Sequence, residues 1–327
     1  MRRIWDLSGR SSRLWATIRP VKMKSQGMRM GDLIIRRLLV DLKQPFARRW
    51  NGGDSFRSAF FNALSMSFVV GEQYFIDSLR QALPLMNEAD RKRLEPEVRG
   101  FIGQEATHRH LHGLYNLHLA AQGFDNAFER RAAARIKANA HVNPRNHVGA
   151  TAATEHFTAV FAAWLMRHPE ALEGADERLR TLWLWHSAEE AEHRAIAFEV
   201  YRAIGGNHTW RLRTYRYVTF TFLSDVLRQT LDNLRRDRAL WQLSTWKSAL
   251  RHLFAADGLI RGNIGAWKAY LRPDFHPLHQ DASASERWLR EHAALYVEVS
   301  RPASLREPSQ AGALRALSQA GALHPVG

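Results

Sequence analysis

The sequence predicts an all-α protein: a four-helix bundle with one long crossover connection and additional C-terminal helices. Two observations lead to this prediction. Helix start and stop signals divide the chain into long segments, and no segment shows the alternation of apolar and polar residues that is typical of strands. In addition, four Glu residues recur at intervals that suit one position on each of four long helices, namely Glu72, Glu105, Glu155 and Glu190.

The boundaries of the first two helices follow from capping and helix-breaking residues. Asp54 or Ser55 can cap a helix that continues until Pro84 stops it. Pro96 suits a first helical position, where its missing N–H costs nothing, and it predicts the start of a second helix that ends at Gly123.

Two further helices complete the predicted core. Asn143 and Pro144 mark a break before a third helix over about 146–167. A fourth helix is expected over about 176–204, because Gly205 is a favoured residue just beyond a helix end.

The chain is expected to divide into three parts. Residues 1–53 form a basic N-terminal arm, 54–300 a helical domain, and 301–327 a low-complexity tail in which SQAGAL occurs twice. The domain is predicted to have a four-helix core over about 54–206 and extra helices over 207–300, the last of them at about 284–300.

The intervals between the four Glu residues fit a bundle with a crossover. Glu72 and Glu105 are 33 residues apart, and Glu155 and Glu190 are 35 apart. Two half-helices and a short connection need about this length for antiparallel neighbours to meet near their middles. The central interval is 50 residues, which leaves room for a long crossover between the second and third helices.

Two of these Glu residues begin a Glu-x-x-His pair: Glu105 with His108, and Glu190 with His193. Residues three apart lie on one face of a helix, so each pair can direct a carboxylate and an imidazole towards the same point. Two such pairs and a lone Glu from each of two other helices form the site of ferritin-like di-iron and di-manganese proteins. The sequence therefore predicts a dinuclear metal site in the helical domain, with Glu72 and Glu155 as the lone residues.

Two more residues share the faces of these pairs, and a third, Glu189, lies beside them. His186 lies four residues before Glu190, and His112 lies four after His108. The ferritin-like pattern needs one His per pair, so each of these is either a seventh ligand or a hydrogen-bond partner of a ligand. Glu189 is a rival ligand if the fourth helix is rotated, although we favour an ion pair with an Arg for it.

Positive charge is concentrated near the N-terminus. Residues 1–60 contain 14 Lys or Arg and four Asp, which accounts for +10 of the net charge of +15. We favour the interpretation that these charges form a solvated basic face. Contact with an anionic membrane surface or a partner is the alternative, because apolar residues flank Arg36 and Arg37. Nucleic-acid binding is not favoured, since no nucleic-acid motif accompanies the charge.

Other features exclude several classes of protein. The chain has no cysteine, so any metal ligands must be His and carboxylate rather than thiolate. No apolar stretch reaches the length of a spanning helix, and the residues after Arg2 and Arg3 lack the apolar segment of a signal peptide. We therefore expect a cytoplasmic protein, with peripheral attachment to a membrane as the alternative.

Six stretches of the chain, in order, resemble a bacterial family named as predicted metal-dependent hydrolases. They are WNGGD at 50–54, GEQYFI at 71–76, FIGQEATH at 101–108, TEHFT at 154–158, WHSAEEAEHR at 185–194 and RPDFHP at 272–277. Together they cover about 45–285. The resemblance implies a metal-dependent protein, and the family name implies hydrolysis.

The spacing of His186, Glu190 and His193 also resembles that of the di-iron arylamine N-oxygenases, in which a third His joins four Glu and two His. This resemblance implies that His186 is the seventh ligand, and we expect His112 to support it. The expected cofactor is two iron ions, with manganese or an iron–manganese pair as the alternative and zinc less favoured, because the ligands are hard or borderline.

Three functions fit these predictions. We favour a di-iron oxygenase or oxidase that acts on a small organic substrate with dioxygen and an electron donor. The alternatives are a metal-dependent hydrolase that activates water at the same site, and a non-catalytic metal-binding or membrane-associated bundle. Five aromatic residues could line an apolar pocket near the metals, although at helical spacing we expect core packing: Phe68, Phe75, Phe157, Phe161 and Trp183.

Overall fold

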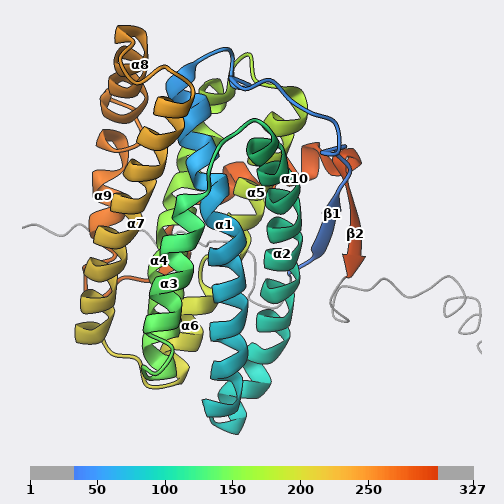
Figure 1. The fold of residues 1–327 in the computed structure, drawn as a ribbon. Coiled ribbons are helices and arrows are strands. Elements are labelled where there is room, and N and C mark those ends of the chain that lie inside the picture. Colours follow the sequence, from blue (N-terminus) through green and yellow to red (C-terminus); the bar gives the residue numbers. More distant parts are fainter. Residues whose placement is uncertain (1–32, 301–327) are drawn as a thin grey trace, which may run out of the picture.

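The structure, a computed structural model, describes residues 33–300 and is mostly helical, as predicted (Figure 1). Its α-helices are α1 (Ser55–Ala82), α2 (Glu88–Ala121), α3 (Ala127–Ala138), α4 (Pro144–Arg167), α5 (Glu177–His193), α6 (Ile196–Ala203), α7 (His208–Arg236), α8 (Leu243–Phe254), α9 (Ile264–Ala269) and α10 (Ser283–Glu291). Strands β1 (Ile35–Leu38) and β2 (Tyr296–Ser300) form an antiparallel sheet. Within this range, no helix has the length and apolar character needed to cross a membrane.

Polar side chains fix where the four helices that carry the predicted ligands begin. Asp54, Asn87, Asn143 and Asp176 each accept a hydrogen bond from a backbone N–H of the helix that follows, at 2.9 to 3.0 Å. The first turn of a helix has backbone donors that no helical carbonyl can reach, and these caps satisfy one of them in each case. The starts of α1 and α5 agree with the sequence prediction, and α4 begins at Pro144, slightly before the predicted start.

α2 begins earlier than predicted, at Glu88, so that Pro96 lies inside the helix rather than at its start. The cap by Asn87 and the acidic residues of the first turn favour the earlier start. Pro96 removes one backbone hydrogen bond from the helix. Burial of Leu94, which has no exposed surface, helps to offset that loss.

The predicted fourth helix is interrupted directly after His193. α5 ends there and α6 begins at Ile196, so the expected continuous helix over 176–204 was wrong. The guanidinium of Arg194 donates to the carbonyl of Ala191, which a continuous helix would have paired with a backbone N–H. Arg194 therefore compensates for the break.

The C-terminal part of the domain contains a strand that was not predicted. α10 ends at Glu291, and the residues that we expected to continue as helix up to 300 instead include β2, which pairs with β1. In this register Arg36 lies opposite Glu298 and Leu38 lies opposite Tyr296. Two strands of four and five residues are too short for a clear alternation in the sequence.

Residues 33–53, which we expected to belong to a separate basic arm, pack against the helical domain. Leu38, Phe46 and Trp50 are buried in its core. Glycines of α2 permit the close approach of the chain beside β1: a Cβ at Gly100 would lie 2.7 Å from Cβ of Leu33. Residues 1–32 and the predicted tail at 301–327 lie outside the described residues.

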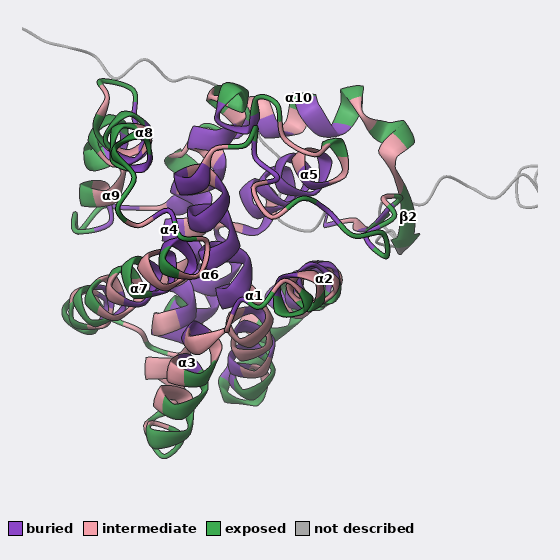
Figure 2. Ribbon diagram, turned by 45° about the horizontal axis from the view of Figure 1, so that its top comes forward, coloured by how far each residue is buried: buried purple, intermediate pink, exposed green. Residues whose placement is uncertain are grey.

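The helices that carry the predicted ligands are in mutual contact. α1 packs against α2 and α4, and α5 packs against α4 and α2. Buried residues gather on α4, α5 and α6, whereas α7 and α8 expose much of their outer surface (Figure 2). The core consists of two apolar clusters, and on α1 and α2 Glu72 and Glu105 lie between residues of the first cluster and residues of the second.

Candidate metal centre

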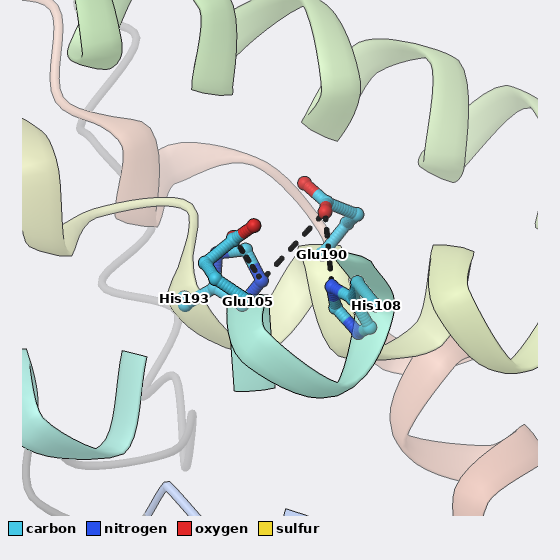
Figure 3. A group of neighbouring side chains, drawn as sticks. All are labelled: Glu105, His108, Glu190 and His193. Carbon is cyan, nitrogen blue, oxygen red and sulfur yellow. Dashed lines mark ion pairs between the residues drawn. The ribbon is translucent and has the colours of Figure 1, made fainter. Parts of the chain in front are cut away.

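All seven predicted ligands lie in one buried region between α1, α2, α4 and α5. Each is at most 5% exposed: Glu72, Glu105, His108, Glu155, His186, Glu190 and His193. Atoms of Glu105, His108, Glu190 and His193 that can bind a metal all lie within 4.8 Å of one another (Figure 3). The same holds for a second group, Glu72, His108 and His186. The structure therefore offers two adjoining sites that share His108.

Glu190 is at the centre of this region. Its Oε1 lies 2.8 Å from Nε2 of His186, 3.7 Å from Nδ1 of His108 and 3.7 Å from Nε2 of His193. Glu105 approaches the same His193 nitrogen at 3.3 Å. A carboxylate with two oxygens in such a position can bridge two ions.

Glu155 takes a more peripheral place than the other ligands. Glu155 belongs to neither of the two groups of possible ligands described above. Its Oε2 lies 3.0 Å from Nδ1 of His193. The two nitrogens of His193 thus face carboxylates on opposite sides, Glu155 on one and Glu105 on the other.

The site holds many buried polar atoms without a hydrogen-bond partner. They are both carboxylate oxygens of Glu72 and of Glu105, one oxygen each of Glu155 and Glu190, Nδ1 of His108 and Nε2 of His193. Buried polar groups are nearly always satisfied, and an unsatisfied one costs roughly 1–3 kcal/mol. A cation bound between these atoms would satisfy them together, so the residues present fit a metal centre.

The electrostatics of the carboxylates lead to the same conclusion. Burial raises the pKa of Glu72 and of Glu105 well above the ordinary value, and the neighbouring charges of Glu190 and Glu155 raise it further. Burial also raises the pKa of Glu155, to about 7. Without a cation these carboxyl groups would retain protons near neutral pH. A divalent cation would offset the repulsion between the ionised carboxylates and so favour loss of the protons.

Both carboxylate oxygens of Glu189 are occupied by hydrogen bonds, one of them to the predicted ligand His108. Its Oε2 lies 2.9 Å from Nε2 of His108, which leaves Nδ1 of that ring directed at Glu190. Its other oxygen accepts a hydrogen bond from the Arg36 guanidinium at 3.0 Å. Glu189 therefore lies between His108 and a buried Arg. The ion pair with an Arg that we favoured for Glu189 is present, and its partner is Arg36 of β1, inside the protein.

Arg36 is a supporting residue of the site that sequence reasoning missed. It donates to Glu189 and also, at 2.7 and 2.9 Å, to both oxygens of Glu192, which accepts a further hydrogen bond from Gln104. Burial would lower the pKa of Arg36, but the hydrogen bonds and charges of Glu192 and Glu189 outweigh it and raise the pKa. The only sequence signal was an Arg within an apolar stretch.

His112 determines which nitrogen of His186 is free. The Ser65 hydroxyl donates to the Asn116 side chain at 2.9 Å, so its oxygen must accept from Nδ1–H of His112, also at 2.9 Å. Burial lowers the pKa of His112, and the neutral ring accepts through Nε2 from Nδ1–H of His186 at 2.8 Å. Nδ1 of His186 is thereby occupied, and its other nitrogen, Nε2, faces Glu190 at 2.8 Å.

This chain of hydrogen bonds agrees with the expected roles of the two residues. A lone pair that faces a carboxylate needs a proton or a metal ion between them, so Nε2 of His186 is placed to bind a metal. His112 uses both nitrogens for hydrogen bonds and has none left for a metal. Metal binding by His186 remains a prediction.

Apolar cavities adjoin the centre on two sides. One has a volume of about 460 Å³ and is lined by Phe157, Phe161, Trp183 and Phe68 together with His186 and Glu190. The other, of about 380 Å³, is lined by Phe68, Phe75 and Glu72. The five aromatic residues that we expected as plain core packing therefore line cavities beside the predicted ligands.

The fold and the site define a mostly helical protein with buried Glu and His clusters that can hold metal ions. Its family is shown by comparison with protein-family models. Residues 34–281 match the model described as "Predicted metal-dependent hydrolase", and the chain belongs to this family. Neither a curated protein nor a solved structure gives a significant match.

Replacement of Arg36 should weaken the metal centre although Arg36 is not a ligand. Arg36→Ala leaves Glu189 and Glu192 buried without their cation, which should cost about 3–5 kcal/mol in stability. It also removes the group that holds Glu189 in place beside His108, which should lower metal affinity about 10- to 100-fold. Metal titration and denaturant unfolding check both effects. Arg37→Ala, an exposed neighbour on the same strand, is the matched control, and equal effects of the two changes would contradict the assignment.

His186 and His112 should respond differently to replacement. His186→Ala removes a predicted ligand and should empty or alter one metal position, whereas His112→Ala should leave both filled with affinity reduced about 10- to 100-fold. Elemental analysis and metal titration distinguish these results, with His110→Ala, an exposed residue of α2, as the control. The reverse order of effects would transfer the ligand role to His112.

The metal-free protein should lose stability between about pH 7 and 9. Burial opposes the protonated form of His193, but Glu190 and Glu155 outweigh it and raise the pKa of His193 to about 9. A group with a raised pKa in the folded state stabilises the fold at low pH, and this stabilisation is lost as the pH rises through that value.

Denaturant unfolding of the metal-free protein at pH 7 and pH 9 measures this loss. His193→Gln should reduce the difference between the two free energies of unfolding. A free energy of unfolding that is constant or higher at pH 9 in the unmodified protein would show that His193 is not paired in this way.

Proposed function

We propose that α1, α2, α4 and α5 form a ferritin-like four-helix bundle that holds two metal ions. The pattern of helix contacts supports two antiparallel pairs, α1 with α2 and α4 with α5, and α3 lies in the long connection between the pairs. A lone Glu on each of α1 and α4, with a Glu-x-x-His pair on each of α2 and α5, matches the ligand arrangement of this class.

The carboxylates that would hold the two ions are those of Glu105, Glu190, Glu72 and Glu155. His108 and His193 each face the centre with one nitrogen, and His186 adds a third imidazole. Carboxylates and imidazoles without thiolate favour iron or manganese, and we propose iron. Two such ions, once reduced, supply the ability to activate dioxygen.

The observation that carries the choice of reaction is the apolar lining of the cavity of about 460 Å³ that the ligands His186 and Glu190 share with aromatic residues. Such a lining binds an apolar organic substrate and excludes water. Oxidation of that substrate with dioxygen fits a dry pocket, and it requires an electron donor. We therefore propose a di-iron oxidoreductase that acts on an apolar organic substrate.

A hydrolase is the second candidate, because the family description favours it. Metal ions at the same ligands would lower the pKa of a bound water and orient the substrate. Hydrolysis would need water at the centre and polar contacts for the departing group. The aromatic residues that line the cavity at His186 suit an apolar substrate better than water and a polar departing group.

The purified protein should contain two iron or manganese ions per chain, and its reduced iron form should consume dioxygen with a change in visible absorption. Glu105→Ala should lose most of the metal because Glu105 is a predicted ligand. Glu177→Ala, on the exposed surface of α5, should keep it. Elemental analysis and an oxygen electrode measure these quantities. One zinc ion per chain, unaffected by Glu105→Ala, would rule out the dinuclear centre, and a redox-silent pair of ions would favour the hydrolase.

A further inference from the structure

α7 and α8 present apolar side chains to solvent. On α7 these are Phe220, Leu223 and Leu227, and Phe220 is 73% exposed. On α8 they follow one another along a single face and are Leu243, Trp246, Leu250 and Phe254, while Trp241 in the connection is 93% exposed. An exposed apolar surface that extends over two helices marks a site of interaction.

This face is continuous with the cavity that reaches the metal centre. Leu227 of α7 and Trp246 and Leu250 of α8 are exposed, yet they also line the cavity of about 460 Å³. His186 and Glu190 line the same cavity. The cavity therefore opens between α7 and α8, which lie along the left edge of the molecule in Figure 1, and connects the exposed face to the predicted ligands.

Exposed basic residues flank the apolar face on both helices. Arg216 and Arg228 on α7, and Lys247 and Arg251 on α8, are exposed, and among residues 33–300 none of them forms an ion pair. α8 contains no acidic residue. On α7, Asp225 pairs with Arg131 and Arg135, and Asp232 pairs with Arg235 and Arg236. The apolar face is thus flanked by cations whose charge is not compensated.

We propose that the face formed by α7 and α8 docks on an anionic membrane surface, and that the substrate is a long apolar molecule that enters the cavity from the bilayer. Exposed Trp and Leu side chains flanked by Lys and Arg are typical of helices that bind membrane interfaces. A second copy of the chain is a poorer partner, because two such faces would bring like charges together. The proposal rests on the proposed function only in its choice of substrate, since docking is independent of the reaction.

Single cysteines provide a direct test, because the chain contains none of its own. Leu250→Cys on α8 and Leu117→Cys on α2 replace leucines that are 61% and 66% exposed, and each can carry a fluorophore sensitive to its environment. With phosphatidylglycerol vesicles, the label at position 250 should shift to shorter wavelength and the label at position 117 should not. Phosphatidylcholine vesicles should give a weaker response, and added salt should reduce the binding to phosphatidylglycerol.

Vesicle sedimentation of the full chain gives the second measurement. Leu250→Glu should weaken binding about tenfold or more, as expected from the loss of one buried leucine, and Leu117→Glu should not change it. Equal responses at the two positions, or no binding to either vesicle, would overturn the proposal. A doubled mass in solution, with the label at position 250 buried before vesicles are added, would also overturn the proposal. It would show that a second copy of the chain covers the face. Glu105→Ala should still dock without metal, so failure of docking and failure of the metal assignment are distinguishable.

Discussion

The burial of four carboxylates in one layer between the helices is the constraint on which the rest of the structure depends. A buried carboxylate is costly unless it is paired, and several of them repel one another. Here imidazoles provide part of the compensation, and metal ions, which the arrangement fits, would provide the rest. α1, α2, α4 and α5 must therefore stay at the separation that this layer sets, and apolar clusters pack on both sides of it.

Two of the imidazoles are held by groups that do not touch the centre. His108 is fixed through Glu189 and Arg36, and His186 through His112 and Ser65. Each contact occupies the ring nitrogen that points away from Glu190, so the other nitrogen has a defined orientation. The centre is consequently preorganised, because its geometry is fixed by protein contacts.

The sequence was sufficient for those parts that depend on local spacing. The Glu-x-x-His pairs and capping residues such as Asp54 act within a few residues, so their positions follow from helix geometry. The parts that were missed depend on contacts between distant segments. Arg36 looked like a surface cation, because nothing near it in the chain indicates a partner at Glu189. Likewise the break after His193 depends on Arg194, which also contacts the carbonyl of Pro277.

The ion pair between Arg36 and Glu189 links the edge of the domain to its centre. Since Glu189 holds His108, attachment of β1 and occupancy of the centre share one set of contacts. Thermodynamic reciprocity then requires that each favours the other to the same extent. A metal ion bound at the centre would therefore stabilise the attachment of β1 to α2, and loss of that attachment would weaken metal binding.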